Sequence, residues 1–287
     1  MSGARSRAAV PTAGSAAPTA SAVSGPSSGP GPLESALRRR RGEGAKLLVP
    51  YVTGGLGQDW PAVIEAVVAA GADAVEVGIP FSDPVMDGPV IQDASARALA
   101  AGATPGAIID ALGRLRPGAP TAVMTYYNLI FRGGHRRMAS LLADAGVAAA
   151  ILPDLPLDES EDWTAAADHF GVETVMLAAP TTSDARLVAI CERSRGFVYG
   201  VGLMGVTGER SALAASASVM AKRLKAVTDK PVLIGVGISS PAQAVEACLE
   251  ADGVVVGSAL VRRLLDGAGP EGAAELVGRF RAALDAG

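Results

Sequence analysis

Three acidic residues lie in one short stretch, VEVGIPFSDPVMDGPVIQ, between Val75 and Gln92. Glu76 stands inside an apolar run, where a carboxylate is costly unless it has a structural ion-pair partner or becomes protonated. Burial raises a carboxyl pKa, which suits a group that gives and takes protons near neutral pH. Asp83 and Asp87 precede Pro and Gly and could simply be turn residues. The stretch is longer than a turn needs, so we interpret it as an active-site loop.

The elements that must position these residues alternate along the chain. From Leu33 onward, short runs of Val, Ile, Leu and Ala alternate with amphipathic stretches of helical period. Eight such strand–helix units favour a (β/α)8 TIM barrel over the alternative, a doubly wound open sheet. The predicted strands are Leu47–Val52, Ala72–Val77, Thr121–Met124, Ala148–Leu152, Glu173–Leu177, Phe197–Val201, Pro231–Val236 and Gly253–Val256.

Helices are predicted between these strands and at both ends of the barrel. A short helix over Glu34–Arg41 is expected to close the bottom of the barrel ahead of the first strand. Because strand C-termini face the catalytic mouth of a barrel, Glu76 would point into that mouth. The other predicted helices are Trp60–Ala70, Pro105–Leu115, Arg136–Ala145, Glu159–Phe170, Asp184–Arg193, Val219–Val227, Pro241–Leu249, Ser258–Leu265 and Glu275–Leu284.

Glycine-rich turns after the last three strands predict a phosphate site. Gly237 follows the seventh strand, and Gly257 and Ser258 follow the eighth, where a short helix begins. The free N–H groups and positive dipole end of such a helix bind anions. Gly208, in GVTG after the sixth strand, could add another backbone donor. Barrels commonly bind phosphate at this place.

Composition excludes several other classes of protein. A net charge of −4 argues against nucleic acid as the main partner. The longest apolar stretches are too short to span a membrane. Cys191 and Cys248 have no close Cys or His companion in the sequence, so neither a disulfide framework nor a zinc site is expected.

The first 32 residues differ from the rest of the chain. They are mostly Ala, Ser, Gly, Pro and Thr and include no acidic residue. Such a segment cannot bury enough apolar surface to order itself, so residues 1–32 are predicted to be a disordered tail before one catalytic domain over 33–287. The tail lacks the apolar core of a secretory signal. We expect a cytoplasmic protein with a bacterial extension, or a plastid protein if the tail is a transit peptide.

The loop E-x-GIPFSDP-x-x-DGP-x-IQ resembles the signature of the tryptophan synthase alpha chain family. The likeness runs from about Leu33 to the C-terminus and includes PYVT, Y-x-N, PDLP, GVTG, GVGIS and GSALV. It implies retro-aldol cleavage of indole-3-glycerol phosphate to indole and glyceraldehyde 3-phosphate, with no metal or other cofactor. It also implies a β subunit that takes up the indole in an alpha-beta-beta-alpha complex.

The resemblance also implies a role for each matching residue. Glu76 would be the general acid and base, Asp87 would accept a hydrogen bond from the indole N–H, and Tyr199 would lie beside the reacting ring. The residues expected to bind the rest of the substrate are Tyr51, Ile91, Met124, Tyr126 and Ile151 around the indole, Thr207 on a mobile loop, and Gly208, Gly237, Gly257 and Ser258 at the phosphate. Pro80 and Asp83 would contact the β subunit.

Three other functions stay open at this point. The chain could release indole without a partner, or it could be a non-catalytic allosteric partner of a β subunit. Intact Glu76 and Asp87 argue against the second of these. A different phosphosugar barrel enzyme would have no reason to contain the GIPFSDP loop.

Overall fold

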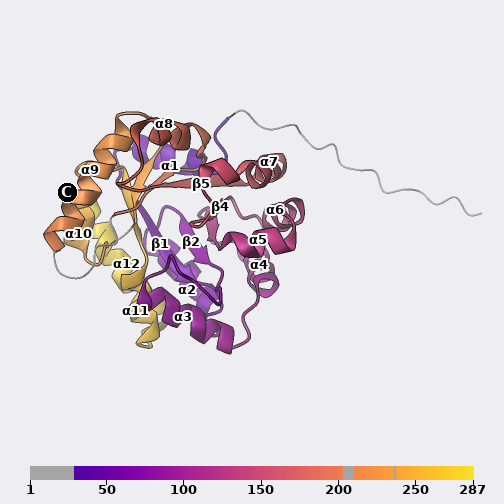
Figure 1. Cartoon of the computed structure of the whole chain (residues 1–287). Coiled ribbons are helices and arrows are strands. Elements are labelled where there is room, and N and C mark those ends of the chain that lie inside the picture. The colour runs from indigo at the N-terminus through magenta and orange to yellow at the C-terminus, as the bar shows by residue number, and fades with distance from the viewer. Residues whose placement is uncertain (1–28, 203–209, 236) are drawn as a thin grey trace, which may run out of the picture.

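Eight parallel strands close into a barrel, and helices surround it (Figure 1). The computed structural model describes residues 29–202, 210–235 and 237–287. The strands follow one another around the barrel in chain order, and β1 pairs with β8 to close it. The predicted (β/α)8 barrel is therefore confirmed, and the open sheet is excluded.

The strands lie where the apolar runs predicted them. Two of them, β3 and β8, have the predicted bounds, and the others differ by a few residues at one or both ends. The eight strands are β1 (Leu47–Thr53), β2 (Val75–Gly78), β3 (Thr121–Met124), β4 (Ala149–Ile151), β5 (Glu173–Ala178), β6 (Val198–Gly200), β7 (Val232–Ile234) and β8 (Gly253–Val256).

Two helices were not predicted, α3 after the acidic loop and α5 after β3. The loop therefore ends at Gly88, and Gln92 belongs to the first turns of α3. The helices are α1 (Pro32–Gly42), α2 (Trp60–Ala69), α3 (Pro89–Ala100), α4 (Pro105–Arg114), α5 (Tyr127–Gly133), α6 (His135–Asp144), the 3-10 turn η1 (Leu157–Glu159), α7 (Glu161–Phe170), α8 (Asp184–Arg193), α9 (Arg210–Lys225), α10 (Pro241–Ala247), α11 (Ser258–Leu265) and α12 (Gly269–Ala286).

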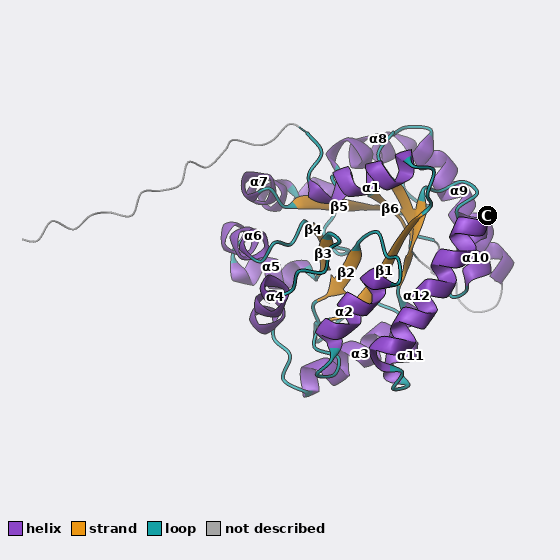
Figure 2. Ribbon diagram, turned by 180° about the vertical axis from the view of Figure 1, so that it is seen from behind, coloured by secondary structure: helices purple, strands orange, loops and turns teal. Residues whose placement is uncertain are grey.

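The predicted N-terminal helix is present as α1 and closes one end of the barrel (Figure 2). Leu33 and Leu37 are fully buried against the side chains that fill the barrel interior. The N–H groups of Leu33 and Glu34 donate to the Glu173 carboxylate over 2.6 and 3.0 Å, so the first residue of β5 caps this helix. Of the predicted tail, residues 1–28 lie outside the described part of the chain, and α1 begins at Pro32.

Alternate residues of each strand face the barrel interior, as the period of a strand requires. The interior cluster includes Val49 of β1, Tyr199 of β6 and Leu233 of β7, and their strand neighbours pack outward against the helices. On β2 the same alternation points Glu76 inward, between the outward-facing Val75 and Val77. The strand geometry therefore places the Glu76 carboxyl group inside the barrel.

Candidate active site

A cavity of about 230 Å³ lies at the C-terminal ends of the strands. Residues from β1, β2, β3, β5, β6 and β8, together with the loops that follow several strands, form its wall. Of the residues predicted to form the site, the cavity brings together Tyr51, Glu76, Asp87, Ile91, Met124, Tyr199, Gly237, Gly257 and Ser258. Side chains separated by up to about 200 positions in the sequence therefore meet in one place.

Glu76 is the buried acid of this cavity. Its side chain is 1% exposed, and no residue in the described part of the chain hydrogen-bonds its Oε2 atom. Burial raises the pKa of the Glu76 carboxyl from 4.5 to about 8, and the negative charge of Asp87 adds to the effect. No ion pair with Glu76 occurs among the described residues, which removes the structural alternative considered from sequence. The group is largely protonated at neutral pH.

Asp87 has a less buried environment. It lies in the loop between β2 and α3, and burial raises its carboxyl pKa to about 6, against the opposing effect of a hydrogen bond with the Tyr126 side chain. Asp87 is therefore mostly ionised at neutral pH, whereas Glu76 is mostly protonated. Two carboxyl groups whose environments separate their pKa values are suited to different tasks in one reaction.

Tyr51 and Tyr199 are buried in the cavity wall because two glycines leave room for their rings. A Cβ atom at Gly78 would lie 1.8 Å from the Tyr51 hydroxyl, and one at Gly235 would lie 2.0 Å from Cε2 of Tyr199. Burial raises the pKa of both hydroxyls, with further contributions from the charges of Glu76 and Asp87. Both tyrosines therefore stay neutral and present phenol rings to the cavity.

Backbone from the loops after β7 and β8 forms another part of the cavity wall. Gly237 adopts a φ of +88°, a conformation that favours glycine, and Gly257 precedes the first residue of α11, Ser258. The first N–H groups of a helix have no partner within it, so the start of α11 offers donors to an anion. Thr207 and Gly208, the other residues predicted for this part of the site, lie outside the described residues.

Two residues predicted to wall the indole slot do not line the cavity. Ile151 is fully buried in the interior cluster below it, paired with Val175 of the neighbouring strand. Leu177, two residues further along β5, lines the cavity instead. Tyr126 lies behind the loop, with its ring stacked on Phe81 at 5.0 Å, and its hydroxyl accepts the Met86 N–H over 2.9 Å.

The two residues predicted to contact a partner have different exposure. Pro80 is buried within the chain, whereas Asp83 is exposed and accepts a hydrogen bond from the Ser82 hydroxyl. Val85 and Met86, later in the same loop, are 77% and 48% exposed. Of the predicted pair, only Asp83 is available to another protein in this conformation.

Several residues of the cavity wall were not predicted from the sequence. Strand alternation could have found four of them, since Leu177, Val201, Gly235 and Val255 lie two residues from an inward-facing residue on or next to the same strand. No local pattern indicates the others, because loops position them. These are Met86, Gly88, Pro153 and Gly202.

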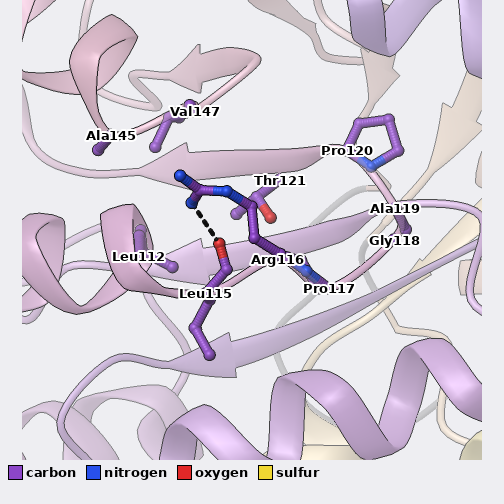
Figure 3. Close-up of a pocket in the computed structure, with 11 residues that line it drawn as sticks. Leu112, Leu115, Arg116, Pro117, Gly118, Ala119, Pro120, Thr121, Ala145 and Val147 are labelled. Atoms are coloured by element: carbon purple, nitrogen blue, oxygen red, sulfur yellow. Dashed lines mark hydrogen bonds between the residues drawn. The ribbon is translucent and has the colours of Figure 1, made fainter.

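A second cavity lies at the opposite end of the barrel, between α4, β3 and the start of β4 (Figure 3). It measures about 400 Å³ and is lined mainly by aliphatic side chains and prolines. Its one charged residue, Arg116, hydrogen-bonds the backbone oxygens of Gly113 and Leu115. Its lining includes no acid or base that is free to take part in a reaction, so the cavity at the strand C-termini is the better candidate for the active site.

The described residues contain neither a candidate metal site nor a candidate membrane-spanning helix. Within the described ranges, no group of three His, Cys, Asp or Glu residues is placed to bind a metal ion. No helix in that part of the chain combines the length and the apolar character that crossing a membrane requires.

The barrel and its cavity define a barrel enzyme in which two carboxyl groups of different pKa share a cavity with backbone groups suited to bind an anion. A family model described as tryptophan synthase alpha chain matches residues 37–282. The alpha chain of Streptomyces coelicolor is 46% identical over 264 residues, covering 88% of this chain and 94% of its own length. That of Thermobifida fusca is 43% identical over 261 residues, covering 89% and 97%.

Solved structures agree with the sequence relatives. A chain of Mycobacterium tuberculosis tryptophan synthase superposes with a TM-score of 0.83 at 38% identity, covering 89% of this chain and 99% of its own. The alpha subunit from Legionella pneumophila gives a TM-score of 0.81 at 29% identity, covering 89% and 99%. The chain belongs to the tryptophan synthase alpha chain family. It is accordingly a carbon–carbon lyase of tryptophan biosynthesis.

Proposed function

We propose that Glu76 and Asp87 divide the proton and charge handling in the cleavage of indole-3-glycerol phosphate. The observation that carries this proposal is a buried, unpartnered Glu76 carboxyl in the same cavity as an Asp87 of lower pKa. The reaction must move one proton from a glycerol hydroxyl to carbon 3 of the indole while the bond between the two parts breaks. Each carboxyl is in the protonation state that its task requires at neutral pH.

Glu76 would act first as an acid and then as a base. Its protonated carboxyl gives a proton to carbon 3 of the indole, and positive charge develops on the ring nitrogen. The bond from carbon 3 to the glycerol chain then breaks, its electron pair returns to the ring, and the glycerol hydroxyl becomes an aldehyde. The hydroxyl proton passes to the Glu76 carboxylate, which restores the starting state. A pKa of about 8 lets one group perform both transfers near neutral pH.

Asp87 would stabilise the charge that forms on the ring. An ionised carboxylate that accepts the indole N–H interacts more strongly once the ring carries positive charge, so it lowers the barrier rather than only tightening binding. Tyr51, Ile91, Met124 and Tyr199, which line the cavity, would enclose the ring and keep water away from it.

The phosphate would bind where the loops after β7 and β8 line the cavity. Gly237, Gly257 and Ser258 line that part, and the positive end of the α11 dipole adds to the attraction for an anion. Thr207 and Gly208 remain predictions for the same region. The substrate would then lie with its phosphate at the glycine turns and its indole beside Asp87.

A β subunit is the proposed protein partner. The relatives named above are alpha chains, and the two solved structures compared above are described as tryptophan synthase. The exposed Asp83 and Val85 of the loop next to the cavity are suited to contact a protein that receives indole. The four-chain assembly and the cytoplasmic location both remain predictions.

An indole-release assay on indole-3-glycerol phosphate, with and without a β subunit, tests the proposal. We expect kcat/KM to follow a bell-shaped pH profile with limbs near 6 and 8, because Asp87 must be ionised and Glu76 protonated. Glu76→Gln and Asp87→Asn should each lower turnover by about a hundredfold or more. Glu65→Gln, an exposed carboxyl on α2, is the matched control. Near-normal turnover in Glu76→Gln would show that the assignment is wrong.

A further inference from the structure

We propose that Tyr126 is a positioning residue that holds the loop between β2 and α3, so that Asp87 faces the substrate, and that Asp154 in turn holds Tyr126. This inference rests on the role proposed above for Asp87. It assigns a function to the PDLP segment at Pro153–Pro156, which has none in the mechanism. It also replaces the sequence-based expectation that Tyr126 forms a wall of the indole slot.

Tyr126 contacts the loop near its beginning and near its end. Its ring stacks on Phe81 with a centroid distance of 5.0 Å and an interplanar angle of 23°. Its hydroxyl accepts the N–H of Met86 over 2.9 Å. The side chain is 4% exposed and therefore has few other positions to adopt. The loop is thus attached to one rigid ring on both sides of the exposed residues Asp83 and Val85.

The same hydroxyl acts on Asp87 directly. A phenol has a single proton to donate, and a hydroxyl that already accepts from Met86 N–H is free to donate it to a carboxylate. The hydrogen bond between Tyr126 and Asp87 holds the pKa of Asp87 below the value that burial alone would produce. Gln92 of α3 donates to the backbone oxygen of Asp87 over 2.9 Å, so the peptide has an anchor of its own. Tyr126 is what orients the carboxylate.

Asp154 holds the backbone from which Tyr126 projects. Tyr126 precedes the first residue of α5, and its own side chain does not cap that helix. Instead, the Tyr127 N–H donates to the Asp154 Oδ1 atom over 2.8 Å. A carboxylate at a helix N-terminus is also favoured by the helix dipole. The loop after β4 therefore fixes the start of α5, and the start of α5 fixes the position of the Tyr126 ring.

The electrostatic surroundings of Asp87 explain why this hydroxyl affects the reaction. The titratable groups that interact with Asp87 are Glu76 of β2, Tyr51 of β1, Tyr199 of β6 and Tyr126 before α5. Burial raises the pKa of the Asp87 carboxyl, while the Tyr126 hydrogen bond lowers it. Removing this hydrogen bond should leave a smaller fraction of Asp87 ionised at neutral pH.

Tyr126→Phe tests the proposal because it keeps the ring and its stacking but removes the hydroxyl. We expect the acidic limb of the kcat/KM profile to move upward by about one pH unit, while the alkaline limb stays in place. The Met86 amide should exchange with solvent about tenfold faster or more, because its acceptor is gone. Tyr127→Phe is the matched control. This variant keeps the backbone N–H that donates to Asp154 and removes only a hydroxyl that lies 2.9 Å from the His135 ring. The pH profile and the Met86 exchange rate should both stay as in the unaltered protein.

Asp154 is tested by comparing two variants. Asp154→Ala removes the acceptor at the start of α5 and should shift the acidic limb in the same direction as Tyr126→Phe. Asp154→Asn retains an acceptor oxygen and should restore most of the original profile. An unchanged pH profile and unchanged Met86 exchange in Tyr126→Phe would overturn the proposal. If the unaltered protein released no indole, the proposed reaction would fail, while Met86 exchange would still decide whether Tyr126 holds the loop.

Discussion

Replacing the buried acid of the cavity, Glu76, by glutamine should make the protein more stable while removing its activity. A carboxyl whose pKa is about 8 when folded and 4.5 in its ordinary state binds its proton more tightly in the folded chain. The stability that comes from this tighter proton binding is therefore fully present below pH 4.5. It is lost progressively as the pH rises from 4.5 to 8, because unfolding then releases the proton of Glu76. One pKa unit corresponds to about 1.4 kcal/mol, so the loss at pH 7 is about 3 kcal/mol.

Glutamine removes this dependence because its amide does not ionise. Near pH 5 the difference in free energy of unfolding should be below about 1 kcal/mol, since Glu76 is then protonated in the folded state and about a quarter protonated when unfolded. By pH 7.5 the variant should be more stable by about 1–3 kcal/mol, the lower bound allowing for an amide that lacks partners. Asp87 titrates in both proteins, so its contribution largely cancels in the difference.

Urea unfolding at a series of pH values between 5 and 8 measures this difference. The diagnostic quantity is the slope against pH of the difference in free energy of unfolding, which should favour Glu76→Gln increasingly as pH rises. Glu65→Gln, at an exposed position on α2, should show no such slope. A constant difference across the series, or a variant that is less stable at pH 7.5, would refute the reasoning from burial.

Other substitutions test the packing that positions the site. Gly78→Ala should lower the free energy of unfolding by about 1–3 kcal/mol and distort the cavity, because its Cβ would overlap the Tyr51 hydroxyl. Gly106→Ala in helix α4, where a Cβ meets no atom within 4 Å, should instead raise stability by about 0.5–1 kcal/mol. Glu173→Ala should cost about 2 kcal/mol, since two N–H groups of α1 lose their acceptor. Urea unfolding measures all three, and equal effects of the two glycine substitutions would contradict the packing argument.

The division of work between the two carboxyls also explains why the loop must be held. Neutral pH lies about one unit above the pKa of Asp87 and about one unit below that of Glu76. Asp87 is therefore mostly ionised and Glu76 mostly protonated in the same pH range. A small displacement that removes the Tyr126 hydrogen bond would bring the two values closer and narrow the pH range in which both states coexist. Positioning of the loop is therefore part of the electrostatics of the site.

Local patterns in the sequence were sufficient to predict the barrel, because burial on both faces selects continuous apolar runs for parallel strands. The runs at Thr121–Met124 and Gly253–Val256 coincide with β3 and β8. The position of Glu76 near the C-terminal end of a predicted barrel strand was enough to predict that it faces the mouth. Helices α3 and α5 were missed. The start of α3 was interpreted as part of the acidic loop, and α5 begins only three residues after β3.

Tertiary structure alone decided how deep each inward residue lies. Ile151 and Leu177 are both inward residues near strand ends, yet only Leu177 reaches the cavity, because the register of β4 against β5 pairs Ile151 with Val175. The sequence likewise indicates that Tyr126 belongs to the site but not that its hydroxyl binds Met86. Register and loop contacts join residues far apart in the chain, and no local spacing encodes them.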